Sequence, residues 1–451
     1  MIILVIAAIH GMCQSISAEQ NYAANSPGVV MVQTVFSATV YVNKVEMNQR
    51  RFTQLVDSVQ RLDTTGTLIT AEKKLDIVVR ALYNNPIRFL DATAGYYRQQ
   101  HRILSAGTGS FISGDGFILT NCHIVDRDSA FIRQKFILST FQEVIDANIR
   151  SLQSSWAMTL SDEQRNLLYN AYTVIYAQVS SMILFDLRRE IYIQFRANTN
   201  DDKLVIRRLP ARLVIKGKPM PGKDIAILKV DSVQELPALR MSEDSIPRIG
   251  GQVLVYGYPE PVTSNIFLDR ETTIEPTLTA GVISAIKKTT TGWPVIQMDA
   301  VISHGSSGSP VCNDNGEVIG IATFGTLEQN TGTLANGYNF AIPLSVVQEY
   351  LDSAHAQAHI SLSSLIWQQG LDFFYKGYYF KALAKFKAVK KESTNYPELY
   401  YYLDACQKRI AAGDDRESFM QKSIFRIIAF LLLIVGIVVF FRWQREKHNN
   451  R

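Results

Sequence analysis

The stretch Asp299-Ala-Val-Ile-Ser-His-Gly-Ser-Ser-Gly-Ser-Pro310 sets one serine, Ser307, in a glycine-flanked run just ahead of an apolar strand. A nucleophilic serine must be exposed on a tight turn, with backbone N–H groups aimed at the oxyanion that it creates. Glycines on either side permit that turn and the close approach of a substrate backbone. A short Gly/Ser run alone is typical of loops, so the stretch predicts a nucleophile only if it has partners.

Two upstream segments supply candidate partners. Thr120-Asn-Cys-His-Ile-Val125 follows a segment in which apolar residues alternate with glycine and polar residues around Gly114-Asp-Gly116. This pattern predicts a β-hairpin that delivers His123 at a strand end. Asp224 precedes an apolar strand, where a lone aspartate is usually a turn or cap residue. The order His123, Asp224, Ser307 is nevertheless one of the known orders of the Ser-His-Asp triad.

In these segments the chain resembles the trypsin-like serine proteases, most closely the HtrA (Deg) group. The family patterns TNxHVV, DIAxLK and TDAxIxxGNSGGP stand here as Thr120-Asn-Cys-His-Ile-Val125, Asp224-Ile-Ala-Ile-Leu-Lys229 and Met298-Asp-Ala-Val-Ile-Ser-His-Gly-Ser-Ser-Gly-Ser-Pro310. The resemblance covers about residues 103–350. It implies a mainly β, chymotrypsin-like fold of two six-stranded antiparallel β-barrels. It also implies a serine endopeptidase that acts on protein or peptide substrates without a metal or cofactor.

The resemblance assigns a role to each residue of the site. Ser307 attacks the scissile carbonyl, His123 takes its proton and returns it to the leaving amine, and Asp224 fixes the imidazole. The backbone N–H groups of Gly305 and Ser307 form the oxyanion hole. Val301, six residues before the nucleophile, stands at the base of the primary specificity pocket. An apolar residue there favours a small or medium apolar substrate side chain, since a buried cation would lack a partner.

The chain departs from the family pattern at two positions. Ser306 replaces an asparagine, and Ser309 replaces a second glycine whose absence could crowd the turn. Ser306 also lacks the acid that a pancreatic-type zymogen switch needs. These departures leave an alternative open, a catalytically silent two-barrel scaffold or adaptor that binds protein partners through its helical segments.

Composition excludes some other classes of protein. The 451 residues are 47% hydrophobic, with a net charge of +5 that is spread along the chain, so nucleic-acid binding is not expected. No Cys/His spacing suggests a zinc site. Cys122 and Cys312 both fall near the predicted site. We favour two buried thiols, and a disulfide in an oxidising compartment stays open.

Both ends of the chain carry apolar segments. Residues 1–18 are interpreted as a signal peptide, with a buried N-terminal strand as the alternative. Residues 424–441 are apolar apart from Arg426 and are interpreted as a transmembrane helix, with a buried core helix as the alternative. The tail 442–451 holds four basic residues and one acid, which makes it cytoplasmic by the positive-inside rule. A single-pass membrane protein with an extracytoplasmic (periplasmic or extracellular) protease domain is therefore expected.

Three further regions surround the predicted protease domain. The N-terminal extension, 19–102, holds a β-like run at 29–42 and helical patterns at 48–62 and 71–83. The insertion 127–200 holds helical patterns at 139–156 and 162–182, the second opened by the capping box Ser161-Asp-Glu-Gln164. It is either an αα insertion packed on the barrel or an element for assembly or gating, and a homo-oligomer stays open.

Residues 362–412 replace the PDZ domain that HtrA proteins usually carry. Helices are predicted at 362–376, 379–391 and 396–411. The spacing of Gly370, Ala382 and Phe386 matches the tetratricopeptide pattern, in which small residues lie where paired helices touch. One repeat is fewer than a stable array needs, so a plain helical hairpin docked on the protease is at least as well supported.

Overall fold

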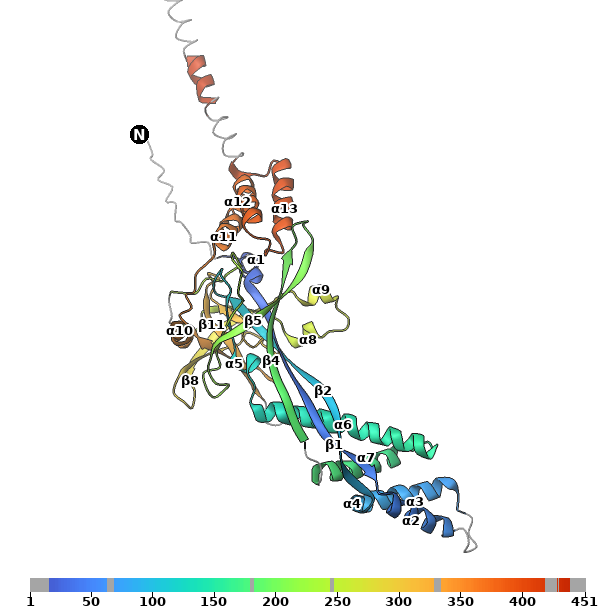
Figure 1. The fold of residues 1–451 in the computed structure, drawn as a ribbon. Helices are drawn as coiled ribbons and strands as arrows, with labels where there is room; N and C mark the ends of the chain where they lie inside the picture. The colour runs from blue at the N-terminus through green and yellow to red at the C-terminus, as the bar shows by residue number, and fades with distance from the viewer. Residues whose placement is uncertain are drawn as a thin grey trace, which may run out of the picture. The chain divides into compact units, whose positions relative to one another are not determined.

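The structure is a computed structural model of the chain. It describes residues 16–62, 69–178, 182–243, 247–327, 334–417, 428 and 430–438. Contacts within it separate two compact units. Unit 1 comprises Met1–Gln33, Ala106–Val125 and Ile191–Arg451, and unit 2 comprises Thr34–Ser105 and Asp126–Glu190. Strands β1, β2 and β4 contribute residues to both units (Figure 1).

Unit 1 contains two closed six-stranded barrels, which confirms the mainly β, two-barrel prediction. The first barrel has the strand order β1(Val29–Met47), β2(Leu90–Phe111), β3(Phe117–Thr120), β6(Ala226–Lys229), β5(Leu204–Lys216), β4(Met182–Asn198). Its core is apolar and holds Phe111, Ile118, Phe195 and Leu228. The predicted hairpin is present, with Gly109 opposite Thr120 and the turn glycine Gly116 at φ +102°.

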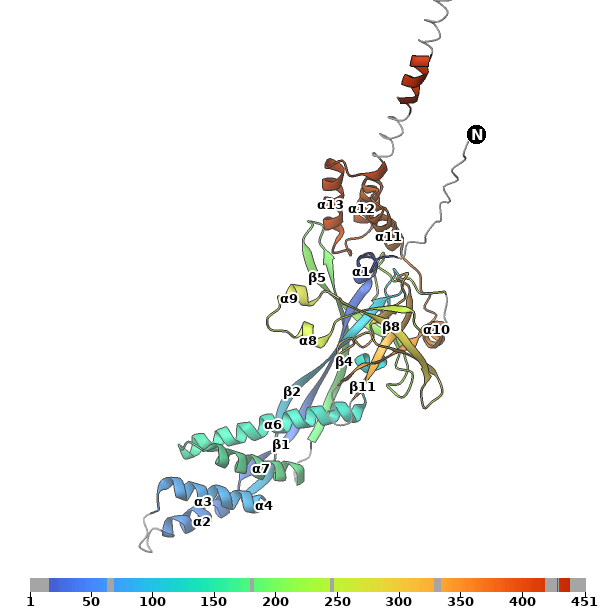
Figure 2. The ribbon, with the colours of Figure 1, turned by 180° about the vertical axis from the view of Figure 1, so that it is seen from behind.

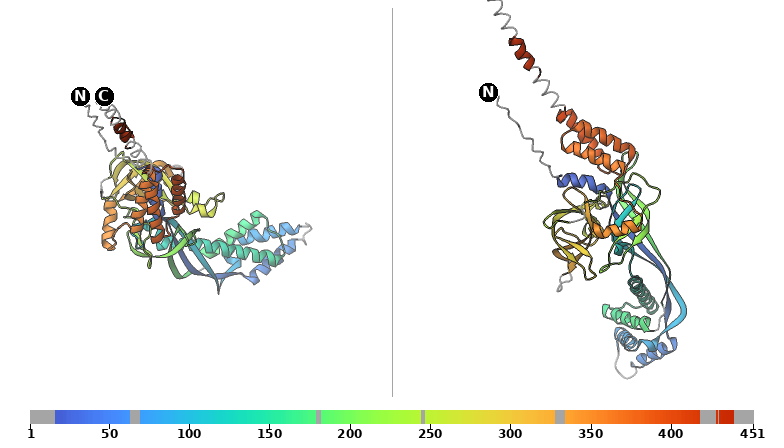
Figure 3. Two further views of the ribbon diagram at one scale, coloured as in Figure 1. Left: turned by 90° about the horizontal axis from the view of Figure 1, so that it is seen from above. Right: turned by 90° about the vertical axis from the view of Figure 1, so that its left-hand side faces the viewer.

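The second barrel has the order β10(Pro310–Cys312), β11(Val318–Leu327), β12(Leu334–Pro343), β9(Pro294–Met298), β8(Thr277–Lys288), β7(Gln252–Gly257) (Figure 3, right, yellow to orange). Between β7 and β8 lie two short helices, α8(Glu260–Thr263) and α9(Arg270–Thr273). Helix α10(Leu344–Ser353) follows β12 and buries Val347 and Leu351 in a cluster with residues of the second barrel.

The predicted boundaries of the protease domain differ from the strands that build it. The first barrel takes β1 from the predicted extension 19–102 and β4 from the predicted insertion 127–200. Closing the barrel needs six strands. Of these, β3, β5 and β6 lie in the remainder of the predicted protease domain, and β2 crosses its start. Position 103 falls inside β2 and marks no edge of the fold.

The C-terminal helices are α11(Leu362–Tyr375), α12(Tyr379–Glu392) and α13(Leu399–Ala411), close to the predicted ranges, and they lie side by side (Figures 1 and 2). A Cβ on Gly370 would lie 2.6 Å from the ring of Phe386, so a glycine is needed where α11 and α12 touch. Trp367 is fully buried and donates to the carbonyl oxygen of Ala23 in α1(Ala18–Asn25) at 2.8 Å.

These helices dock on the first barrel, as the plain-hairpin alternative proposed. The Asn198 Nδ2 group, at the end of β4, donates to the carbonyl oxygen of Tyr396 at 2.7 Å. The N–H of Ser363, at the start of α11, donates to Glu235 at 2.8 Å. The likeness of 362–412 to a tetratricopeptide repeat stays a prediction.

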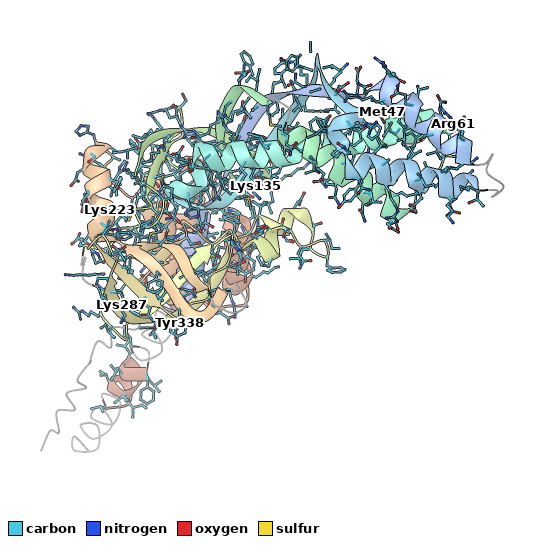
Figure 4. All side chains as sticks on the ribbon, turned by 90° about the horizontal axis from the view of Figure 1, so that it is seen from below. Met47, Arg61, Lys135, Lys223, Lys287 and Tyr338 are labelled. Carbon is cyan, nitrogen blue, oxygen red and sulfur yellow. The ribbon has the colours of Figure 1, made fainter. Side chains whose placement is uncertain are left out.

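Unit 2 combines the N-terminal extension with the insertion. Helices α2(Gln49–Gln60), α3(Ala71–Asn84), α4(Pro86–Phe89), α6(Ser129–Trp156) and α7(Asp162–Gln178) pack with the strand segments of this unit. In Figure 4, Met47 marks the end of β1, Arg61 directly follows α2, and Lys135 lies on α6. The shared core includes Val79, Phe136 and Ile175. The insertion helices therefore share a core with the extension.

The capping box of α7 forms as predicted. The N–H of Gln164 donates to Ser161 Oγ at 3.2 Å, and the N–H of Ser161 donates to Gln164 Oε1 at 3.1 Å. Both bonds satisfy N–H groups that a helix start leaves without partners.

The terminal predictions fall largely outside the described residues. Of the signal peptide 1–18, positions 1–15 are not described, and Ala18 begins α1. Of the membrane helix 424–441, positions 428 and 430–438 are described, and the tail 442–451 lies outside the described residues. Within the part of the chain that the structure covers, no helix has the length and apolarity needed to cross a membrane.

Candidate active site

His123 and Asp224 lie in direct contact. His123 belongs to the short helix α5(Cys122–Val125), which follows β3, and Asp224 lies in the turn before β6. His123 Nδ1 is 2.6 Å from Asp224 Oδ2, and the backbone N–H of His123 donates to Asp224 Oδ1 at 2.8 Å. Asp224 is 1% exposed. A carboxylate that engages Nδ1 in this way holds the imidazole so that Nε2 remains as the base.

Two further side chains hold Asp224. Thr323, in β11, donates from Oγ1 to Asp224 Oδ2 at 3.0 Å, and Asn121 donates from Nδ2 to the Asp224 carbonyl oxygen at 2.7 Å. Sequence reasoning missed this contact of Thr323. The signal that it offered was a hydroxyl directly after the apolar run 318–322 of β11.

Ser307 lies on the loop before β10. Its Oγ donates to the carbonyl oxygen of Thr323 at 3.3 Å. Within the described residues, no hydrogen bond joins Ser307 to His123. Acyl transfer thus requires the hydroxyl to exchange the Thr323 carbonyl for His123 Nε2 as its acceptor.

The backbone of the Ser307 loop leaves two N–H groups without a protein acceptor. Every carbonyl oxygen from residue 304 to 307 accepts a hydrogen bond, and the N–H groups of Ser306 and Gly308 donate to Ser303 and Ala322 at 2.9 and 2.8 Å. Among the described residues, Gly305 N–H and Ser307 N–H have no such acceptor. These two are the predicted oxyanion donors, and an oxyanion hole needs donors that the protein has not already used.

Gly305 is needed for steric reasons as well. Its φ is +88°, a left-handed conformation, and an added Cβ would lie 2.3 Å from the Tyr258 carbonyl oxygen and 2.8 Å from the Glu260 nitrogen. Both are backbone atoms and cannot move aside without displacing the strand end. The loop thus accepts only glycine at the residue that is predicted to supply one oxyanion donor.

The departure at Ser309 is accommodated by another glycine. Ser309 is fully buried, its Oγ has no hydrogen-bond partner among the described residues, and a Cβ on Gly257 would lie 2.1 Å from that oxygen. The missing side chain at Gly257 therefore provides the space for Ser309. Ser306 Oγ accepts from the N–H of Ser303 at 3.3 Å, so it braces the same turn.

The remaining predicted positions have these surroundings. Val301 is 58% exposed, and its carbonyl oxygen accepts from Thr279 Oγ1, so its place in a specificity pocket stays a prediction.

Cys122 and Cys312 are buried thiols, as favoured from the sequence. Burial raises the pKa of Cys312 far above its usual range. Among the described residues, no group of three or more His, Cys, Asp or Glu side chains is placed to hold a metal ion.

Comparison with known proteins matches the segment that holds Asp224 and Ser307. A family profile described as a trypsin-like peptidase domain matches residues 177–321. The serine endoprotease DegS of Escherichia coli K12 is 33% identical over 133 residues, which cover 29% of this chain and 34% of DegS. The serine protease HTRA4 of Mus musculus is 31% identical over 166 residues, which cover 35% of this chain and 30% of HTRA4.

The chain spans about a third of the length of the curated relatives that it matches. A solved HtrA-type protease with a decapeptide is 18% identical over 76% of this chain and 68% of its own, at a TM-score of 0.36 that is too low to bear on the fold. The matching family profile describes a peptidase domain, and the matching curated relatives are serine proteases. The chain is thus similar to trypsin-like peptidase domains over residues 177–321 and to HtrA-type serine proteases over about a third of its length.

Proposed function

We propose that this protein is a membrane-anchored, extracytoplasmic serine endopeptidase that cleaves unfolded or damaged proteins through an acyl-enzyme. The observation that carries the proposal is the site itself. A buried carboxylate orients His123, and the Ser307 loop holds two backbone donors that have no acceptor among the described residues. In the first half-reaction Ser307 Oγ attacks the scissile carbonyl, His123 Nε2 takes its proton, and the two donors stabilise the oxyanion. His123 then returns the proton to the leaving amine, and water releases the acyl group by the same steps.

We infer the substrate class from the curated relatives and from the apolar side chain of Val301. DegS and HTRA4 are named as serine proteases, so we propose polypeptide substrates. An apolar residue at position 301 favours small or medium apolar side chains before the scissile bond.

Unfolded casein tests this activity directly. We expect the purified wild-type protein and an exposed-serine control, Ser345→Ala on α10, to cleave casein, and we expect Ser307→Ala to be inactive. Equal cleavage by wild type and Ser307→Ala, or no cleavage by either across a broad pH range, would refute the proposal.

A specific observation keeps the adaptor function as a second candidate. Ser307 Oγ donates to the Thr323 carbonyl, an arrangement in which the serine is not activated. A fluorophosphonate probe separates the two functions. A protease labels at Ser307, whereas an adaptor that keeps its hydroxyl on Thr323 stays unlabelled.

The membrane anchor and the location rest on the sequence alone. The apolar segments 1–18 and 424–441 and the basic tail support a single-pass protein with its protease domain outside the cytoplasm. Expression of the full chain beside a form ending at residue 417 tests the anchor. The full chain should stay with membranes at alkaline pH, and the shortened form should be released.

A further inference from the structure

The side chain of Thr108 connects the two barrels at the nucleophile loop. Thr108 lies in β2 of the first barrel and is fully buried. Its Oγ1 accepts from the N–H of Tyr258 at 2.9 Å and donates to the carbonyl oxygen of Gly305 at 2.8 Å. Both Tyr258 and Gly305 belong to the second barrel or its loops. The hydroxyl therefore has one donor and one acceptor, both from the backbone.

The backbone of Thr108 holds the same loop. Its N–H donates to the carbonyl oxygen of Ser307 at 2.8 Å, and its own carbonyl oxygen accepts from Thr120 Oγ1 at 2.7 Å. A Cβ on Gly308 would lie 2.0 Å from that carbonyl oxygen. This one residue thus contacts the loop on both sides of the nucleophile, at Gly305 and at Ser307.

These bonds restrain the peptide planes around Gly305. A peptide unit is planar and joins the C=O of one residue to the N–H of the next, so a hydrogen bond to a carbonyl also sets the direction of the following residue's N–H. The His304 carbonyl shares its plane with Gly305 N–H, and the Gly305 carbonyl shares its plane with Ser306 N–H. The carbonyl oxygens of His304 and Gly305 are engaged by Glu260 N–H at 2.6 Å and by Thr108 Oγ1. Gly305 has no side chain to restrain its rotation, so its two flanking peptide planes depend on these outside contacts.

We propose that Thr108 is a positioning residue for catalysis. Its hydroxyl holds the Gly305–Ser306 peptide, which lies between the two peptides that carry the oxyanion donors, and so limits the rotation that would turn those donors away. The inference rests on the proposed peptidase function. It adds a contact from the first barrel that neither the triad nor the oxyanion donors supply. Thr108 touches no reacting atom and acts only through the loop.

Three variants isolate the hydroxyl. Thr108→Val keeps the branched shape and removes the hydroxyl, while Thr108→Ser keeps the hydroxyl and removes a methyl group. Ser110→Ala is the matched control, because Ser110 lies two residues along the same strand, is equally buried, and its Oγ has no hydrogen-bond partner among the described residues.

The measurement is kcat and KM on a peptide substrate, with active sites counted by fluorophosphonate titration. Loss of a whole oxyanion donor lowers kcat by about 10²–10³. We therefore expect a misdirected donor to lower the kcat of Thr108→Val roughly 10-fold or more. KM should stay within about 2-fold, because the ground state does not use the oxyanion hole. Thr108→Ser should recover most of kcat, and Ser110→Ala should match wild type. A peptide boronate, which forms a tetrahedral adduct, should lose affinity for Thr108→Val in parallel with kcat/KM.

The outcomes separate this inference from the function on which it rests. If wild type reacts with the probe and Thr108→Val has the kcat of Ser110→Ala, the positioning role is wrong and the peptidase function stands. The positioning role is equally wrong if Thr108→Val and Thr108→Ser lose the same activity. If Thr108→Val does not fold, Thr108→Ala, measured in the same way, decides. A wild-type protein that neither turns over substrate nor reacts with the probe overturns both proposals.

Discussion

Replacement of Gly305 by valine tests whether the loop geometry, rather than the triad alone, supports catalysis. The new Cβ would lie 2.3 Å from the Tyr258 carbonyl oxygen and 2.8 Å from the Glu260 nitrogen. The loop must shift, and the Gly305 N–H moves with it. Losing one oxyanion donor costs about 2.7–4 kcal/mol, so kcat should fall by roughly 10²–10³. The left-handed backbone, at φ +88°, adds about 1–2 kcal/mol to the loss of folding stability.

The control for this experiment is Gly292→Val in the turn between β8 and β9. Gly292 has nearly the same backbone conformation, φ +91°, but an added Cβ would meet nothing within 4 Å. It therefore reproduces the backbone strain without the clash or the oxyanion donor. We would measure kcat and KM on a peptide with an apolar side chain before the scissile bond, together with urea unfolding. The reasoning fails if Gly305→Val and Gly292→Val have kcat values within about 3-fold of each other, because a lost donor alone should separate them far more.

Three other variants test buried polar groups. Thr323→Val removes a hydrogen bond to the Asp224 carboxylate. A hydrogen bond to a charged group contributes about 1.5–3 kcal/mol, so kcat/KM should fall roughly 10- to 100-fold. Unchanged kinetics would show that this bond does not orient the triad. Ser309→Ala removes a buried hydroxyl without a partner and should stabilise the fold by about 1 kcal/mol in urea unfolding, whereas a loss of stability would mean that the Oγ is satisfied. Burial raises the pKa of Glu398. The folding stability that its protonated form contributes is therefore complete below the ordinary pKa of about 4.3. It is lost as the pH rises through the raised pKa of the folded state. Glu398→Gln should accordingly be more stable than wild type at pH 7, and the difference should vanish below about pH 4; a difference that does not change with pH would contradict this.

Much of the site could be predicted because its signals are local. The hairpin before His123, the strand after Asp224 and the glycines around Ser307 each show in a few consecutive residues, and the structure places His123 against Asp224. Helix ranges in 362–411 and the capping box at Ser161 were predictable for the same reason. Periodicity and capping act within one or two turns of chain.

What sequence reasoning missed depends on residues far apart in the chain. Thr323 meets Asp224, and Thr108 meets Gly305, only once two barrels have closed around them. In the same way, the extension and the insertion each look like a separate appendage, whereas Val79 and Ile175 share one core. Hydrophobic burial is non-directional, so an apolar helix face does not show in the sequence which other face will cover it. The motifs around His123, Asp224 and Ser307 carried the family resemblance that implied the chemistry and the barrels. The contacts that Thr323 makes with Asp224 and Thr108 with Gly305, and the pairing of two distant segments into unit 2, were decided only when the chain packed.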